Sequence, residues 1–205
     1  MSEIRDESLW ESGKRKIEWV RQNMSLLRSV EEDFKRDQPF KGLKVALSIH
    51  LEAKTAYLCK VLAAGGAEMY ITGSNPLSTQ DDVAAGLVHD GLNVFAWHGA
   101  TDEEYHRHIS EVVKVGPNII IDDGGDLVNL AAGDGHPAEI MDMSFAIQAL
   151  SAAYLVKNKD KLTDKIVYVP DEIDKEVANR KLKFWELEID KLTPEQEKYL
   201  NSWQV

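Results

Sequence analysis

The chain has 205 residues, 43% of them hydrophobic, and its 35 acidic and 24 basic residues give a formal net charge of -11. A chain of this length buries one substantial core but is short for two independent domains. The negative charge repels phosphate backbones and anionic membrane surfaces, which excludes nucleic acid and membranes as expected partners and favours a small-molecule ligand.

The first predicted element is one amphipathic helix over Trp10–Phe34, because Ile17, Val20, Leu27 and Val30 recur at mostly helical spacing. Beyond it, short apolar runs alternate with stretches rich in helix formers. The apolar runs predict four strands, at Leu43–Ile49, Glu68–Thr72, Leu92–Trp97 and Asn118–Ile121. The intervening stretches predict three helices, at Ala53–Ala64, Thr79–Val88 and Thr101–Val115.

A long helix is predicted to start at Pro137 and to reach Leu155, because proline is common in the first helical turn. Three elements are expected after it: a strand at Ile166–Val169 and two helices, one from Asp171 and one from Thr193 to near Trp203. The alternation of strands and helices predicts a three-layer α/β fold, flavodoxin-like or Rossmann-like, with a mostly parallel sheet and helices on both faces.

The location of the protein follows from what the sequence lacks. The single cysteine, Cys59, cannot form an intrachain disulfide, and the first residues have neither the basic start nor the apolar core of a secretory signal. No apolar run has the length needed to cross a bilayer. We therefore expect a cytoplasmic protein.

Polar side chains follow the predicted strands at their carboxyl ends, where ligands bind in folds of this class. His50 follows the first strand, and Asp122 and Asp123 follow the fourth. The polar residues after the second strand are Asn75, Ser78, Thr79 and Gln80. This agreement between polar positions and strand ends predicts a ligand crevice at that edge of the sheet.

Two of these residues are candidates for proton transfer. A histidine at a strand end titrates near neutral pH, so His50 is suited to the role, although many histidines are simply packed or solvated. Crowded carboxylates favour protonation of one of them, which makes Asp123 a candidate base; alternatively, the acids cap the next element or hold its turn. His106 and His108 do not share a helix face, so we expect them to be exposed and predict no metal site.

Five segments resemble the two sequence flanks of S-adenosylhomocysteine hydrolase, a family in which an NAD-binding domain is inserted between two parts of a substrate-binding domain. The segments are HLEAKT (50–55), SNPLSTQDD (74–82), DDGGDLV (122–128), GHPAEIMDMSFAIQALS (135–151) and IDKLTPEQEKYLNSW (189–203). The resemblance implies a single substrate-binding domain over 1–205, formed by residues 1–128 and 129–205, with the inserted domain missing near Val128-Asn129.

The resemblance also assigns roles to individual residues. His50 matches the catalytic histidine that assists proton transfer at the 5′ position of the substrate, and Asp123 matches a residue of the substrate site. Gly135 and His136 lie against the purine, with Met141 and Phe145 as its apolar wall or, alternatively, as ordinary core residues. The remaining substrate-binding matches are Glu52, Lys54, Thr55, Asn75, Ser78, Thr79 and Gln80.

The HLEAKT segment departs from the animal-type pattern, which reads approximately HMTxET. Glu52 replaces threonine and Lys54 replaces glutamate at positions associated with the purine edge. Hypoxanthine offers an acceptor at O6 and a donor at N1, and lysine has only donors whereas ionised glutamate has only acceptors. The pair therefore favours inosine or S-inosylhomocysteine over the adenosine compounds, unless it is a plain surface ion pair.

NAD is the cofactor of the complete family enzyme, but no cofactor is expected in this chain. It has no G-x-G-x-x-G fingerprint after a strand, and Gly65-Gly66 follows a predicted helix instead. We therefore expect a domain that binds a nucleoside or its S-homocysteine conjugate without normal turnover, because the redox chemistry belongs to the cofactor. A noncatalytic interaction subunit, with possible self-association, is the alternative, and an NAD-independent hydrolase using His50 and Asp123 is a third.

Overall fold

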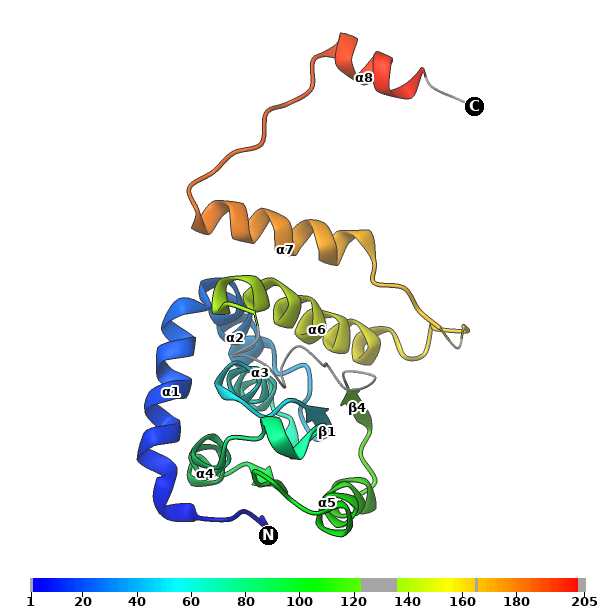
Figure 1. Ribbon diagram of the computed structural model, residues 1–205. Coiled ribbons are helices and arrows are strands. Elements are labelled where there is room, and N and C mark those ends of the chain that lie inside the picture. Colours follow the sequence, from blue (N-terminus) through cyan, green and yellow to red (C-terminus); the bar gives the residue numbers. More distant parts are fainter. Residues whose placement is uncertain (1, 123–135, 165, 203–205) are drawn as a thin grey trace.

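The computed structural model describes residues 2–122, 136–164 and 166–202, and its ordered body is built on a parallel sheet (Figure 1). The four strands are β1 (Lys44–Ile49), β2 (Glu68–Gly73), β3 (Asn93–Val94) and β4 (Ile119–Asp122), in the order β3-β2-β1-β4. All neighbouring strands are parallel. The chain winds from β1 to β3 on one side and then crosses to β4 on the other, so β1 lies at the topological switch point.

Helices cover both faces of this sheet, which confirms the predicted three-layer α/β class. Side chains alternate between faces along a strand. Val45, Leu47 and Ile49 of β1 point into the main core, together with α3 (Ala53–Ala64) and α4 (Asp81–His89). The other face carries Ala46, which packs with Val112 of α5 (Asp102–Lys114).

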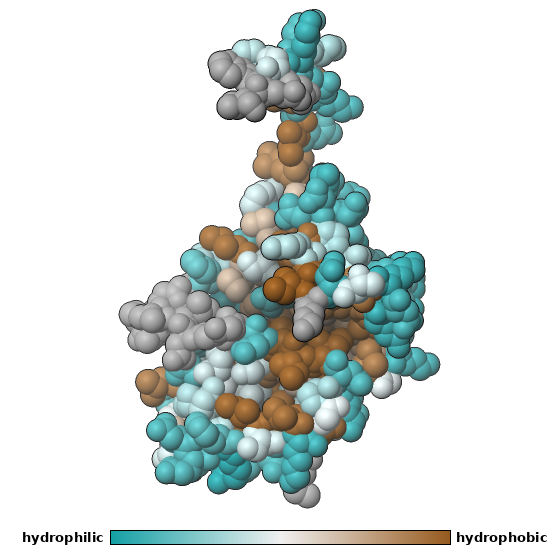
Figure 2. All heavy atoms as spheres, turned by 90° about the vertical axis from the view of Figure 1, so that its right-hand side faces the viewer, coloured by the Kyte–Doolittle hydropathy of each residue, from teal (hydrophilic) through white to brown (hydrophobic). Residues whose placement is uncertain are grey.

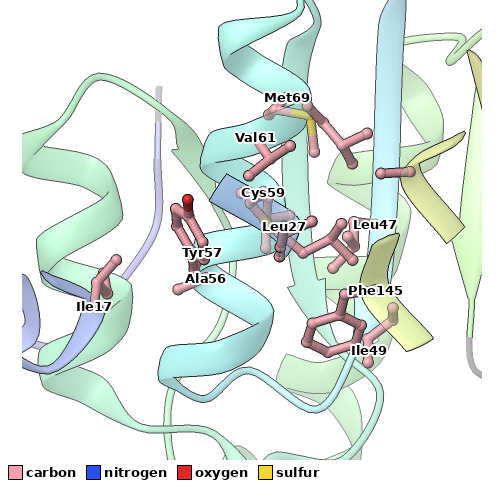
Figure 3. Close-up of a cluster of buried hydrophobic side chains, with 14 of the residues drawn as sticks. Ile17, Leu27, Leu47, Ile49, Ala56, Tyr57, Cys59, Val61, Met69 and Phe145 are labelled. Carbon is pink, nitrogen blue, oxygen red and sulfur yellow. The ribbon is translucent and has the colours of Figure 1, made fainter. Parts of the chain in front are cut away.

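Figure 3 shows how the main core joins distant parts of the chain. Leu47 and Ile49 of the central strand lie beside Phe145 of α6 (Ala138–Asn158), and Tyr57 and Cys59 of α3 are fully buried there. Burial raises the pKa of the Cys59 thiol well above its usual range, so it stays protonated. The cysteine is therefore a packing residue, as its position on a central helix indicates.

The long amphipathic helix predicted at Trp10–Phe34 is wrong in one respect: the structure has two helices, α1 (Trp10–Asn23) and α2 (Ser25–Asp37). The chain leaves helical geometry at Met24, which has φ -106° and ψ 71°. The cause is a long-range contact, because the buried carboxylate of Asp142 accepts hydrogen bonds from the backbone N–H groups of Leu26 (3.1 Å) and Leu27 (2.7 Å). A carboxylate at this position caps a new helix start.

The strand predicted at Ile166–Val169 is also wrong. Residues 167–169 have no regular secondary structure, and Ile166 and Tyr168 are 76% and 87% exposed. A short run of β-branched and aromatic residues favours a strand only where a neighbouring strand supplies hydrogen bonds, and none of the described strands pairs with this one. The helices predicted around it are confirmed as α6, α7 (Asp171–Phe184) and α8 (Pro194–Asn201), the last with a capping box at Thr193.

The strand predicted at Leu92–Trp97 is shorter than expected, because β3 is an edge strand paired along only two residues. Beyond it, Phe95 forms an isolated bridge with Glu3 near the start of the chain. The backbone of Glu3 bonds to Val94 and Ala96 and so covers this edge. Two 3₁₀ turns, η1 (Glu7–Leu9) and η2 (Pro76–Ser78), complete the described elements.

His106 is exposed, as expected, whereas His108 is 1% exposed and packs edge-on against Trp97, 4.2 Å between ring centroids, which corrects the expectation that both are exposed. Burial lowers the pKa of His108 below its usual 6.5. The unfolded chain therefore binds a proton that the folded chain does not. We expect the free energy of unfolding to decrease as pH falls below about 6.5 and to be independent of this group above it.

Denaturant unfolding of His108→Gln between pH 5 and about pH 8 tests this dependence. In His108→Gln, the free energy of unfolding should decrease less steeply as the pH falls. His106→Gln removes an exposed histidine two positions away and should leave this pH dependence unchanged. Equal slopes in His108→Gln and the unmodified chain would contradict the assignment.

Candidate functional site

His50 lies immediately after β1, at the switch point of the sheet, and is 2% exposed. Its Nδ1 is 2.6 Å from Oγ of Ser78. The Ser78 hydroxyl also donates to the backbone oxygen of Asn75 at 2.9 Å. The contact with Ser78 fixes the orientation of the His50 ring.

The loop that holds Ser78 is shaped by its own polar side chains. Asn75 Oδ1 accepts a hydrogen bond from the N–H of Leu77 at 2.8 Å and so caps η2. Thr79 is 3% exposed, and the N–H of Gln80 bonds to the backbone oxygen of Leu51 at 2.9 Å. Asn75 and Thr79 thus help to place Ser78 and Gln80 next to the end of β1, and their predicted contacts with a ligand stay predictions.

The start of α3 is defined by Glu52, whose carboxylate accepts hydrogen bonds from the N–H groups of Lys54 (3.1 Å) and Thr55 (3.2 Å). The same carboxylate is 3.2 Å from Nζ of Lys54, and both side chains are largely buried, at 16% and 14% exposure. An ion pair between Glu52 and Lys54 is therefore present, but it is largely buried, whereas the sequence alternative was a surface pair. Because both charges are held in place at the helix start, they present a fixed acceptor beside a fixed donor.

A cavity of about 790 Å³ opens at this helix start. Its lining brings together four of the predicted site residues, Glu52, Lys54, Gln80 and His136. They come from three separated parts of the chain: the β1–α3 turn, the loop after β2 and the start of α6. His50 and Ser78 do not line this cavity. They lie on two of the same chain segments, the β1–α3 turn and the loop after β2, and contact each other there.

The cavity also contains residues that the sequence interpretation missed. Arg15, Lys16 and Trp19 of α1 form one of its walls, and Trp19 is 60% exposed. Lys16 is anchored by Asp82, 2.8 Å away, and reaches Oε1 of Gln80 at 3.3 Å. The available signal was the basic run 14–16 followed by an aromatic residue in a chain of net charge -11.

The remaining predicted residues are placed elsewhere or are not described. Phe145 is 2% exposed in the main core, and Met141 is partly buried against that core, so neither lines the cavity. Thr55 is buried at 1% exposure in the first turn of α3. Asp123 and Gly135 lie outside the described residues, and their roles stay predictions.

Comparison with known proteins identifies the family. The family description S-adenosyl-L-homocysteine hydrolase matches residues 1–134 and 133–204. The chain therefore belongs to the S-adenosyl-L-homocysteine hydrolase family. Its two matched segments meet at residues 133 and 134, a few positions beyond the junction predicted near Val128-Asn129.

Several curated archaeal relatives carry one of two names. The chain is 52% identical over 130 residues to the S-inosyl-L-homocysteine hydrolase of Methanocaldococcus jannaschii, covering 63% of this chain and 31% of the relative. It is 48% identical over 124 residues to the adenosylhomocysteinase of Sulfurisphaera tokodaii, covering 60% and 30%. It is 38% identical over 167 residues to that of Pyrococcus abyssi, covering 82% and 39%. The matched parts thus span about a third of the length of these relatives.

The starts of α3, α4 and α5, the helices that follow β1, β2 and β3, do not fit the pyrophosphate of NAD. A dinucleotide site needs a glycine turn and unpaired N–H groups at a helix start after a strand. Here the carboxylate of Glu52 already occupies the start of α3, Asp81 and Asp82 begin α4, and α5 begins with three acids behind a capping box. Negative charge at each of these positions disfavours a phosphate.

Among the described residues, no helix combines the length and the apolar character required to cross a membrane.

Proposed function

We propose that this chain is a nucleoside-binding domain of the S-adenosylhomocysteine hydrolase type, which takes a nucleoside or its S-homocysteine conjugate and lacks normal turnover by itself. The observation that carries the proposal is the convergence of Glu52, Lys54, Gln80 and His136 on one cavity. The sequence alone predicts all four as ligand contacts, and three separate chain segments have to fold together to bring them to one cavity.

The cavity has the chemistry that a purine nucleoside requires. Trp19 offers an aromatic face to a base, and the Glu52–Lys54 pair offers an acceptor and a donor to its edge. In this proposal His50, which follows β1 and contacts Ser78, accepts or delivers a proton at the 5′ position of the ribose. The complete family enzyme adds NAD for its redox steps, and the described residues offer no equivalent group.

Calorimetric titration of the cofactor-free chain with adenosine, inosine and their S-homocysteine conjugates tests the proposal, together with a product assay with and without added NAD. Binding without product formation is the expected result. Absence of binding to all four compounds would contradict the nucleoside site, and product formation by NAD-free protein would instead favour the NAD-independent hydrolase.

The arrangement of Glu52 and Lys54 favours hypoxanthine as the purine. Glu52 is held by two backbone N–H groups and by Lys54, which keeps it an anionic acceptor for the N1–H of hypoxanthine. Lys54 supplies a donor for O6. Adenine has an acceptor at N1 and a donor at N6. In the same pose its N1 would face the acceptor Glu52 and its N6 would face the donor Lys54, which a buried site penalises. The name S-inosyl-L-homocysteine hydrolase among the relatives supports this choice.

Glu52→Gln is expected to weaken inosine binding by about tenfold or more and to leave adenosine binding equal or stronger, because a hydrogen bond to a charged group contributes about 1.5–3 kcal/mol. The amide oxygen can still cap α3. Parallel titrations with both nucleosides measure the ratio, and Glu103→Gln, an exposed change on α5, is the matched control. An unchanged inosine-to-adenosine ratio in Glu52→Gln would remove the purine assignment.

A second candidate function, a noncatalytic interaction subunit, is favoured by the C-terminal helix. In Figure 1, α8 stands apart from the sheet-centred body, and Tyr199 and Leu200 are 63% and 60% exposed. The corresponding family segment reaches the NAD site of a neighbouring subunit. Co-purification with the full-length Methanocaldococcus jannaschii relative tests this function, and a Tyr199→Ser, Leu200→Ser variant that binds equally well would count against it.

A further inference from the structure

The outer edge of β4 is a strand edge that no described strand covers. β4 pairs only with β1, whereas the opposite edge of the sheet is covered by the chain start at Glu3. The N–H of Asn118 donates to the backbone oxygen of Lys44 in β1 at 2.8 Å. Backbone groups alternate in direction along a strand, so Ile119 and Ile121 direct theirs away from β1. Parallel sheets are normally covered, and an exposed edge of this kind is a template for another strand.

The face of the sheet beside this edge is also incompletely covered. Ile120 is 62% exposed in the middle of β4, and Val113 of α5 is 53% exposed. A cavity of about 380 Å³ lies between α5 and the sheet, lined mainly by apolar atoms of Ala46, Val112 and Ile120. Figure 2 looks at the side of the molecule on which β4 lies in Figure 1, and shows apolar side chains gathered over a hollowed part of it.

One buried polar atom in this cavity needs a partner. Thr72 of β2 is 1% exposed and lines the cavity, yet its hydroxyl has no hydrogen-bond partner among the described residues. A buried hydroxyl without a partner costs about 1–3 kcal/mol, which an incoming polar group would recover. The cavity thus combines an apolar lining with one specific hydrogen-bonding position.

The family comparison indicates what covers this surface. The two matched segments meet at residues 133–134, shortly after β4 ends at Asp122, while the relatives are about three times as long as the part that matches. On the other side of the junction, residues 166–169 form an exposed apolar segment of strand-like composition that pairs with no described strand. The outer edge of β4 and the apolar segment 166–169 therefore flank the place where the relatives carry additional sequence.

We propose that the outer edge of β4 and the cavity beside it are a docking surface for a separate polypeptide that carries the family's middle section and adds at least one β-strand to the sheet. The added strand hydrogen-bonds to the outward groups of Ile119 and Ile121. An apolar side chain of the partner fills the cavity over Ile120, and a polar group bonds to Thr72. This interaction goes beyond nucleoside binding, because the nucleoside cavity is formed by other residues, on α1, α3 and α6.

Co-expression of the full chain with the middle section of the Methanocaldococcus jannaschii relative, between the counterparts of the two matched segments, tests the proposal. The expected result is a soluble one-to-one complex by light scattering. In hydrogen exchange, the amides of Ile119 and Ile121 should be protected in the complex and exchange readily in the free chain. A middle section that stays insoluble or separate in the presence of the chain would overturn the proposal.

Ile120→Lys is the decisive variant, because it places a charge on the exposed face while leaving the β1–β4 hydrogen bonds intact. It should weaken the complex by at least about tenfold, as expected for a central interface residue. Leu9→Lys is the matched control, at a residue of η1 with 39% exposure, and should bind normally. Equal binding by both variants would overturn the proposal, as would a homodimer of the chain that Ile120→Lys dissociates.

Nucleoside titration of the Ile120→Lys chain separates this proposal from the proposed function. Binding of inosine is expected to be unchanged in that variant. Failure of the partner experiment with intact nucleoside binding contradicts only the docking surface, and loss of nucleoside binding in the unmodified chain contradicts only the nucleoside site.

Discussion

Asp142→Ala is expected to lower the free energy of unfolding by about 3–5 kcal/mol, because it removes one partner of a buried ion pair. Asp142 is fully buried, and its carboxylate accepts hydrogen bonds from Leu26 N–H, Leu27 N–H and Lys181 Nζ, the last at 2.7 Å. Lys181 is itself 3% exposed. Alanine leaves a buried ammonium group and two N–H groups of α2 without their acceptor. Urea denaturation followed by circular dichroism measures the loss.

Two further variants separate the charge from the helix cap. Asp142→Asn keeps an acceptor oxygen and should lose less than alanine. Lys181→Met removes the unpaired ammonium group, so adding it to Asp142→Ala should recover part of the stability. If the double variant instead loses the sum of the two single losses, Lys181 and Asp142 do not act as a pair and the explanation fails.

Gly13→Ala is expected to destabilise the protein by about 3 kcal/mol, although alanine is the better helix former by about 1 kcal/mol. A Cβ atom at residue 13 would stand 1.8 Å from the backbone oxygen of Asp82, where α1 crosses α4. The two helices would have to separate. Because α1 carries Arg15 and Trp19 into the nucleoside cavity, ligand affinity should fall together with stability.

Ser12→Ala is the matched control for this prediction. It removes one hydrogen bond to Asp82 at 2.7 Å, from the neighbouring position on the same helix, and should cost about 1 kcal/mol without displacing α1. Thermal unfolding with and without inosine compares the two variants. A Gly13→Ala chain that is more stable than the original would mean that helix propensity outweighs the close crossing.

The elements that the sequence predicted correctly are those specified by local chemistry. β1 is a short, mainly apolar run, α3 begins at an acidic cap and ends at a glycine pair, and α8 starts with a capping box at Thr193. The two errors concern residues whose structure depends on distant partners. The break at Met24 depends on Asp142, and the strand propensity of 166–169 has no effect without a neighbouring strand.

The candidate site was partly predictable for the same reason. His50 and Gln80 follow strands, so their placement at one edge of the sheet follows from the parallel topology alone. The basic run 14–16 and Trp19 pointed to a role for α1, but its place in the cavity wall was not predictable, because the direction of the helix depends on the Gly13 crossing with α4. The second role of Glu52, as helix cap as well as ligand candidate, is visible only where the turn geometry is known.

The cap on α2 has a consequence for synthesis of the protein on the ribosome. Its donors, Leu26 and Leu27, precede their acceptor Asp142 by 116 and 115 positions, and Lys181 is made 39 positions later still. When the first matched segment has emerged, the start of α2 still has no acceptor for its amides and the core still lacks Phe145. Completion of the native body therefore waits for the second segment, and the nascent chain exposes apolar surface to chaperones until α6 and α7 have been released.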